Sequence, residues 1–220
     1  MARLKIGVLI SGRGSNLQAL IDAAADPGYP AEIVLVLSDR PEAAGLERAA
    51  RAGIAHQAIP HPSREAFAAA ADAALRQSGA ELVALAGYMR ILDSDFVAAW
   101  RDRLINIHPS LLPAFPGLHP QRQALAAGVR FSGCTVHFVR AEVDTGPIIA
   151  QAVVPVHADD DEERLSARIL TVEHRLYPMA VRLFAEGRLE VREDRVVVAG
   201  ATAPGASLLN PSEALASRGG

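Results

Sequence analysis

Apolar positions follow two alternating periods along the first half of the chain. Short apolar runs, many of them β-branched, are each followed by a segment in which apolar residues recur every three or four positions. The first pattern is typical of buried strands and the second of amphipathic helices. The strands are expected over residues 4–10, 32–37, 55–59, 82–86 and 104–107. The helices are expected over residues 17–24, 43–52, 63–77 and 93–100. This alternation predicts an α/β fold, a mostly parallel twisted sheet with helices on both faces.

Residues at the expected helix ends support this pattern. Asn16 precedes the first helix and is expected to cap it, and Ser63 begins an incomplete capping box before the third. Gly53 follows the second helix, where a glycine commonly ends one.

The second half of the chain has a different pattern. Residues 108–120 form a proline-punctuated apolar loop, and loops of this length inside a domain are usually functional. Strands follow over 135–139 and 148–156, and a long helix over 163–185. The length fits one domain over residues 1–199, and the Ala, Ser, Gly and Pro content of residues 200–220 predicts a flexible tail.

Composition and charge exclude several classes of protein. A chain of 220 residues that is 50% hydrophobic and 21% charged is globular, and 22 basic against 25 acidic side chains argue against nucleic-acid binding. The first apolar run is short and lacks a cleavage site, so neither export nor a membrane is expected. Cys134 is the single cysteine, which suits a reducing, cytoplasmic compartment. Lys5 is the sole lysine, which argues against Schiff-base chemistry.

The segment Ser11-Gly-Arg-Gly-Ser-Asn16 joins the first expected strand to the first helix. Backbone N–H groups and the helix dipole favour an anion at such a turn, so the segment is a candidate phosphate site. A dinucleotide fingerprint would need a third glycine where Leu17 stands, although Asp39 at the end of the second strand keeps that alternative open. A tight turn without a ligand is the other interpretation.

Asn106 and His108 end the fifth expected strand. Residues two apart on a strand point to the same side, so an amide donor and an imidazole are presented together. A lone histidine is usually structural, but catalytic groups in such folds gather at the carboxyl ends of parallel strands. The pair suits polarisation of an acyl oxygen and proton transfer rather than a covalent intermediate.

Two acidic residues are less informative by themselves. Asp144 lies in a turn before Thr-Gly-Pro, where a capping role is ordinary, although a carboxylate beside His108 would fix its tautomer. Glu173 and His174 lie on the long helix, where a solvated or capping role is the default. No metal site is expected, because the seven histidines form no i, i+4 pair with a glutamate and have no cysteine partners.

Four motifs in order identify a family. They are Ser11-Gly-Arg-Gly-Ser-Asn-Leu17, Leu85-Ala-Gly-Tyr-Met-Arg-Ile-Leu92, Asn106-Ile-His-Pro-Ser-Leu-Leu-Pro113 and Phe115-Pro-Gly-Leu-His119. The chain resembles the folate-dependent phosphoribosylglycinamide formyltransferases over roughly residues 4 to 190. The third motif occurs across the wider formyltransferase group. The first and fourth motifs narrow the resemblance to the phosphoribosylglycinamide formyltransferases within that group.

The resemblance implies a single-domain, Rossmann-like formyltransferase fold and a set of site residues. The implied catalytic residues are Asn106, His108 and Asp144. The implied contacts of glycinamide ribonucleotide are Gly14, Ser15, Asn16, Leu17, Gln18 and Glu173. The implied contacts of 10-formyltetrahydrofolate, the formyl donor, are Arg64, Met89, Arg90, Ile91, Leu92, Asn106, Arg140, Ala141, Glu142, Val143 and Asp144.

The implied reaction is direct formyl transfer from this donor to the glycinamide amine in purine biosynthesis. Residues 1–100 would bind phosphate, and residues 101–199 would carry catalysis and the folate. A strand order 3-2-1-4-5 would bring the two sites together at a switch point. The expected partners are small molecules, without nucleic acid or membrane, and the expected assembly is a monomer or homodimer.

Three alternatives remain beside this reading. A formyltetrahydrofolate hydrolase would share the histidine and aspartate but normally carries an N-terminal regulatory domain, for which the sequence given has no room. A methionyl-tRNA formyltransferase would need a C-terminal RNA-binding domain, while the residues after Glu190 are few and not basic. A non-catalytic folate or nucleotide binder with the same fold is the third, since fold alone does not prove activity.

Overall fold

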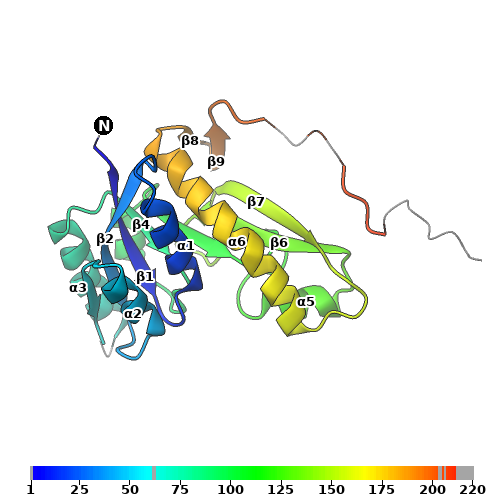
Figure 1. Ribbon diagram of the computed structural model, residues 1–220, viewed down its shortest axis with the longest axis horizontal. Helices are drawn as coiled ribbons and strands as arrows, with labels where there is room; N and C mark the ends of the chain where they lie inside the picture. The colour runs from blue at the N-terminus through cyan, green and yellow to red at the C-terminus, as the bar shows by residue number, and fades with distance from the viewer. Residues whose placement is uncertain (1, 61–62, 203–204, 206, 212–220) are drawn as a thin grey trace, which may run out of the picture.

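A seven-stranded sheet in the order β3-β2-β1-β4-β5-β6-β7 forms the centre of the structure (Figure 1). The structure is a computed structural model and describes residues 2–60, 63–202, 205 and 207–211. The strands of this sheet are β1 (Leu4–Ile10), β2 (Ala31–Ser38), β3 (His56–Ala58), β4 (Leu82–Leu85), β5 (Leu104–His108), β6 (Phe131–Phe138) and β7 (Ile148–Pro155).

The first five strands are parallel and lie in the order 3-2-1-4-5, the order that would bring the two expected sites together. The last two are antiparallel, so the sheet is mostly parallel, as expected. The chain moves outward from β1 to β3 and then returns to β4 beside β1. The carboxyl ends of β1 and β4 therefore flank a switch point, where open α/β sheets bind their ligands.

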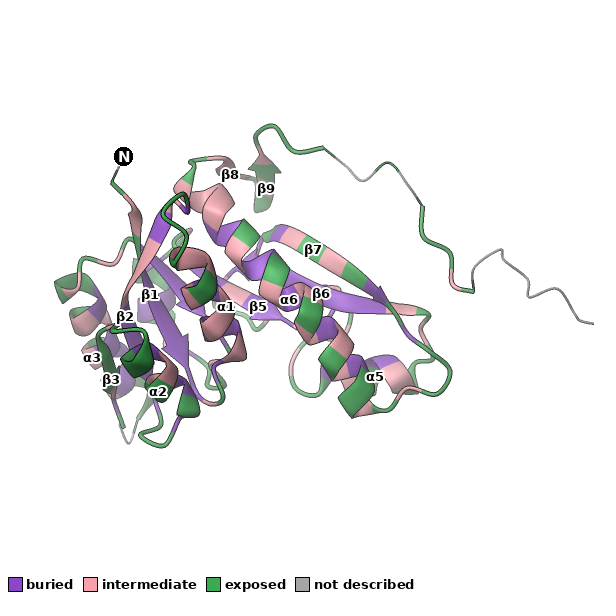
Figure 2. Cartoon of the chain, in the orientation of Figure 1, coloured by how far each residue is buried: buried purple, intermediate pink, exposed green. Residues whose placement is uncertain are grey.

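Helices cover both faces of the sheet. They are α1 (Ser15–Ala24), α2 (Ala44–Arg51), α3 (Arg64–Gln77), α4 (Ser94–Ala99), α5 (Pro120–Ala126) and α6 (Glu162–Ala185). Strand residues alternate between two apolar clusters: on β1, Val8 joins the cluster beneath α1 and α6, whereas Leu9 joins the cluster beneath α3 and α4. Figure 2 shows the central strands buried and the outer helices in bands of buried and exposed residues. No helix among the described residues has the length and apolar character needed to cross a bilayer.

The starts of two helices test the expected caps. Ser63 caps α3, because its side chain accepts a hydrogen bond from the Ala66 N–H at 3.1 Å. The expected Asn16 cap of α1 is wrong: the N-cap is Gly14, with φ 68° and no side-chain cap bond, and Asn16 is inside the helix. A Cβ on Gly14 would lie 2.7 Å from the Gly45 Cα, so glycine is required by both conformation and space.

Two elements were not expected from the sequence. One is the short helix α5, which follows the proline-rich loop. The other is a hairpin of β8 (Leu189–Arg192) and β9 (Arg195–Val198), which follows α6 (Figure 1). Its turn residues, Glu193 and Asp194, both have positive φ, but they lack the Asn-Gly or Asp-Gly signature of such turns.

The predicted flexible tail, residues 200–220, lies partly outside the described residues. Within the described part, the Asn210 amide donates to the Val156 carbonyl at 3.1 Å.

Candidate active site

The loop between β1 and α1 is held from α2. The Arg48 guanidinium donates to the Arg13 carbonyl at 2.8 Å and to Gln18 Oε1 at 3.2 Å. The Gly45 N–H donates to the Gly12 carbonyl at 3.0 Å. These bonds fix the loop while the first-turn N–H groups of α1 stay available, which is the arrangement that binds anions.

Asn16 and Glu173 meet where α1 packs against α6. Asn16 Nδ2 donates to Glu173 Oε2 at 2.9 Å, and Glu173 is only 5% exposed. Burial raises the pKa of the Glu173 carboxyl, although the hydrogen bond from Asn16 acts in the opposite direction. Asn16 Oδ1 is buried and has no hydrogen-bond partner among the described residues. The default expectation of a solvated or capping role for Glu173 is wrong, because Glu173 lies in the interior of α6 and α1 packs against it there.

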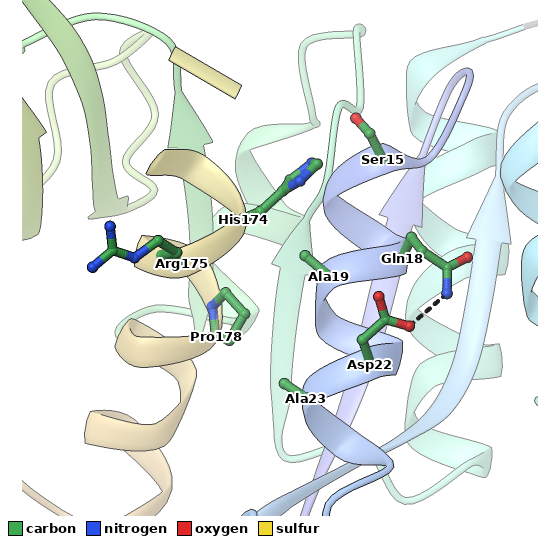
Figure 3. Close-up of a pocket in the computed structure, with 8 residues that line it drawn as sticks. All are labelled: Ser15, Gln18, Ala19, Asp22, Ala23, His174, Arg175 and Pro178. Carbon is green, nitrogen blue, oxygen red and sulfur yellow. Dashed lines mark hydrogen bonds between the residues drawn. The ribbon is translucent and has the colours of Figure 1, made fainter. Parts of the chain in front are cut away.

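A pocket of about 490 Å³ lies between the same two helices (Figure 3). Ser15 is at its upper end, beside the loop, and His174 projects from α6 toward that end. His174 Nε2 is buried without a hydrogen-bond partner in the described part of the chain. Burial lowers the pKa of His174, so its ring offers a neutral donor or acceptor. The pocket therefore extends the anion-binding turn with further polar groups.

The structure brings together the three residues expected to be catalytic. Asn106 and His108 extend from the carboxyl end of β5, and Asp144 lies in the turn between β6 and β7. His108 Nδ1 lies 3.4 Å from Asp144 Oδ2, and His108 Nε2 lies 3.1 Å from the Phe115 carbonyl oxygen. Both ring nitrogens therefore face oxygen acceptors, one on Asp144 and one on the backbone.

His137 is a member of the cluster that sequence reasoning missed. It lies opposite Asn106 in the β5–β6 ladder, and its Nε2 is 3.3 Å from Asn106 Nδ2 and 3.8 Å from Asp144 Oδ1. His137 Nδ1 is 2.9 Å from the Phe138 carbonyl oxygen, so Nδ1 donates and Nε2 accepts from the Asn106 amide. Burial lowers the pKa of His137, which keeps it neutral. The sequence did contain one signal for His137: its neighbours on β6, Val136 and Phe138, are core residues, so His137 must point to the opposite side of the strand.

Asp144 is held in an uncommon backbone conformation by its neighbours. Its φ is 56°, and its Oδ2 accepts the Gly117 N–H at 2.8 Å. Two residues later, a Cβ on Gly146 would lie 1.7 Å from the Phe138 carbonyl oxygen, so the turn passes directly against β6. A second cavity of about 260 Å³ opens beside Asp144, lined by Leu112, Pro113, Pro116, Val143, Thr145, Gly146 and Ile148.

The segment after β4 connects the loop between β1 and α1 to the expected donor site. The Met89 N–H donates to Ser11 Oγ at 2.9 Å. Arg90 Nε lies 2.8 Å from a carboxylate oxygen of the buried Asp39, so this aspartate pairs within the protein. Met89 and Ile91 are 67% and 54% exposed, whereas Leu92 is buried in the core.

The other expected donor residues lie around this segment. Arg64 begins α3 and is exposed. Ala141, Glu142 and Val143 are exposed in the turn before Asp144. The Arg140 side chain is instead paired with Asp102 and Asp194. No group of three or more His, Cys, Asp or Glu side chains within the described ranges is arranged to hold a metal ion.

A parallel sheet with an anion-binding turn at one strand and an Asn-His-Asp cluster at another defines a class of acyl-transfer enzyme. The family model described as formyl transferase matches residues 4–181, so the chain belongs to the formyl transferase family. Within this family, several of its relatives are named phosphoribosylglycinamide formyltransferase, and a less similar one, at 35% identity, is named formyltetrahydrofolate deformylase. The enzyme of that name from Escherichia coli is 46% identical over 204 residues, which cover 91% of this chain and 96% of the relative.

Two further relatives have names from the same pathway or the same activity. The crystal structure of glycinamide ribonucleotide transformylase 1 from Symbiobacterium toebii has a TM-score of 0.87 and 54% identity, over 89% of this chain and 94% of that chain. The trifunctional purine biosynthetic protein adenosine-3 of Drosophila pseudoobscura pseudoobscura is 56% identical over 192 residues, 85% of this chain. The chain spans only 14% of that relative's length.

Proposed function

We propose that this chain transfers the formyl group of 10-formyltetrahydrofolate to the amine of N1-(5-phospho-D-ribosyl)glycinamide. The observation that carries the proposal is the contact of His108 with Asp144 at 3.4 Å beside Asn106, at the sheet edge that also holds the turn after β1 and the exposed apolar segment after β4. The products are the N-formyl ribonucleotide and tetrahydrofolate, in purine biosynthesis. No covalent enzyme intermediate is needed, since none of the clustered groups is an activated nucleophile.

The ribonucleotide occupies the first half of the chain in this proposal, about residues 1–100. Its phosphate binds the turn at residues 14–18, where the N–H groups that begin α1 meet the ligand, and the pocket between α1 and α6 takes the ribose. The unpartnered Asn16 Oδ1 and the buried Glu173 then contact the glycinamide near its amine. Unpaired buried polar groups are unfavourable, so a ligand that satisfies them gains affinity.

The formyl donor occupies the cleft that residues 89–92 and 140–144 border, with Arg64 toward its carboxylate-bearing tail. The exposed Met89 and Ile91 suit the apolar pterin and benzoyl parts of such a ligand. Asn106, His108 and Asp144 belong to the second half, about residues 101–199, and lie where the formyl carbon would meet the amine.

The reaction proceeds by direct attack. The neutral amine nitrogen bonds to the formyl carbon, and the carbonyl electrons move to its oxygen. The Asn106 amide and the protonated His108 donate hydrogen bonds to this oxyanion, each donor contributing about 3 kcal/mol. For this step, His108 Nε2 exchanges the Phe115 carbonyl for the formyl oxygen. Asp144 holds the charged imidazole through Nδ1.

Collapse of the tetrahedral intermediate completes the transfer. The bond between the formyl carbon and N10 of the folate breaks, and N10 takes up a proton while the attacking nitrogen loses one. A water bound to Asp144 can relay this proton. The chemistry uses no metal, and the single cysteine is compatible with a cytoplasmic location.

The test follows the absorbance of folate deformylation with and without glycinamide ribonucleotide. Ribonucleotide-dependent deformylation is expected, and the variants His108→Ala and Asp144→Asn are expected to lose it. Deformylation without the ribonucleotide would instead support a hydrolase, and binding without turnover a non-catalytic homologue. Wild-type rates in either variant would contradict the assigned mechanism.

A further inference from the structure

Arg140 connects three separate segments of the chain. Its Nη2 lies 2.7 Å from Asp102 Oδ1, in the turn that leads into β5, and its Nε lies 3.2 Å from Asp194 Oδ1, at the tip of the β8–β9 hairpin. Its Nη1 also donates to the carbonyl of Val139 at 3.2 Å. The Arg140 side chain is 11% exposed, so the guanidinium is enclosed by these partners.

The hairpin that supplies Asp194 is itself fixed to the core. Leu189, Val191 and Val196 pack against the main apolar cluster, and β9 lies against β7. The Ala199 N–H donates to the Arg188 carbonyl at 2.8 Å, which closes the hairpin at its base. Asp194 is therefore presented to Arg140 by a braced element, although the family match ends before it, at residue 181.

The contacts with Arg140 have a consequence for the turn that carries Asp144. That turn is anchored at its far end, where the Phe138 N–H donates to the Pro147 carbonyl at 2.9 Å. At its near end, the Val139 N–H donates to the Leu104 carbonyl at 2.9 Å, and the ion pairs of Arg140 hold the next residue. Residues 141–143 are exposed, and the Thr145 hydroxyl donates to the Glu142 carbonyl at 3.2 Å. The ion pairs of Arg140 are therefore one of several contacts that fix this turn, and the one that Asp102 and Asp194 supply.

We propose that Asp102 and Asp194 are positioning residues for the formyl donor, and that they act by holding Arg140 and with it residues 140–144. This inference rests on the proposed function, in which these residues border the donor cleft. Neither carboxylate touches the reacting atoms. Isolated ion pairs on the surface contribute little to stability. Here one nearly buried guanidinium is shared by two carboxylates. Loss of either carboxylate therefore loosens the backbone of residues 140–144 and not only the Arg140 side chain.

The proposal predicts a specific kinetic signature. Asp102→Asn and Asp194→Asn should each raise the KM for 10-formyltetrahydrofolate by roughly threefold to tenfold. The KM for glycinamide ribonucleotide should not change, because that site is on α1 and α6. Asp194→Glu, which keeps the charge, should recover part of the loss. The side chains of Asp102 and Asp194 are 41% and 60% exposed, so both variants should fold.

The matched control is Glu193→Gln, which removes one negative charge from the adjacent position of the same hairpin turn. Glu193 makes no ion pair with Arg140 in the described part of the structure. An unchanged donor KM in both aspartate variants, equal shifts in both KM values, or the same shift in Glu193→Gln would overturn the proposal.

Hydrogen exchange of residues 140–144 supplies a readout that does not depend on activity. We expect faster exchange of these amides in Asp102→Asn and Asp194→Asn than in the wild type, with unchanged exchange in α1. Unchanged exchange in the turn overturns the positioning role. Absence of formyl transfer by the wild type would contradict the proposed function alone, so the two failures are distinguishable.

Discussion

The Asn106 amide on β5 and the His137 imidazole on β6 lie opposite each other, with Nδ2 3.3 Å from Nε2. Because His137 Nδ1 donates to the Phe138 carbonyl, Nε2 can only accept. The contact therefore fixes which way the Asn106 amide faces. One N–H is directed to His137, and in the proposed mechanism the other donates to the formyl oxygen.

Replacement of His137 should therefore slow catalysis through Asn106. We expect Asn106→Ala to lower kcat by about 100-fold to 1,000-fold, as for loss of one oxyanion donor. His137→Leu should lower kcat by roughly tenfold, because the amide donor remains but is no longer oriented. In the double variant, His137→Leu should add nothing to the loss from Asn106→Ala. If steady-state kinetics show instead that the two kcat losses multiply in the double variant, His137 does not act by orienting the Asn106 amide.

The buried Glu173 predicts a pH dependence of stability. Burial raises its pKa, so the folded chain keeps a proton that the unfolded chain releases. Its effect on the free energy of unfolding therefore becomes less favourable as pH rises from the ordinary carboxyl value toward the raised one. Glu173→Gln should be more stable than the wild type at pH 7, and this advantage should disappear near pH 4. Thermal unfolding at both pH values tests this, and an advantage equal at both would contradict it.

Arg48 should affect ribonucleotide binding without contacting the reacting atoms. Arg48→Ala removes both bonds that hold Arg13 and Gln18, so the phosphate-binding turn becomes less ordered. We expect the KM for glycinamide ribonucleotide to rise about tenfold, with little change for the folate. Arg51→Ala, on the same helix, is the control, because Arg51 is exposed and pairs only weakly with Glu47 at 3.8 Å. Equal increases in KM for both substitutions would mean that the loss of a positive charge on α2, and not the loss of the bonds to Arg13 and Gln18, weakens ribonucleotide binding.

Gly146 should tolerate no side chain. The added Cβ of Gly146→Ala would lie 1.7 Å from the Phe138 carbonyl oxygen, so the turn must move and take Asp144 with it. We expect a Tm lower by roughly 4–10 °C and a kcat lower by at least about tenfold. Gly205→Ala is the matched control, because its added Cβ meets nothing within 4 Å among the residues that the structure describes. Differential scanning calorimetry and initial rates measure both effects, and a wild-type Tm would refute the steric argument.

Periodicity along the chain was sufficient to predict the mostly parallel sheet and to single out some of the candidate site residues. The β-α alternation predicted a mostly parallel sheet, which is confirmed, whereas the spatial order 3-2-1-4-5 entered only as a condition and is supplied by the structure. Asn106 and His108 could be recognised because residues two apart on one strand share a side, a relation fixed by local geometry. The assigned roles of these residues remain predictions. The short elements α5 and β8–β9 were not found, because a few residues carry too little periodicity.

Sequence therefore determined the order of the longer strands and helices, the glycine-rich turn after β1 and the polar end of β5, since each follows from neighbours along the chain. Only the tertiary structure decided that Asn16 would pair with Glu173, 157 residues away, rather than cap its own helix. It likewise brought His137 against Asn106 through strand register, and Arg140 between two distant aspartates. The physical reason is that burial decides these pairings. A buried polar group must find a partner in space, and that partner is set by how helices and strands pack.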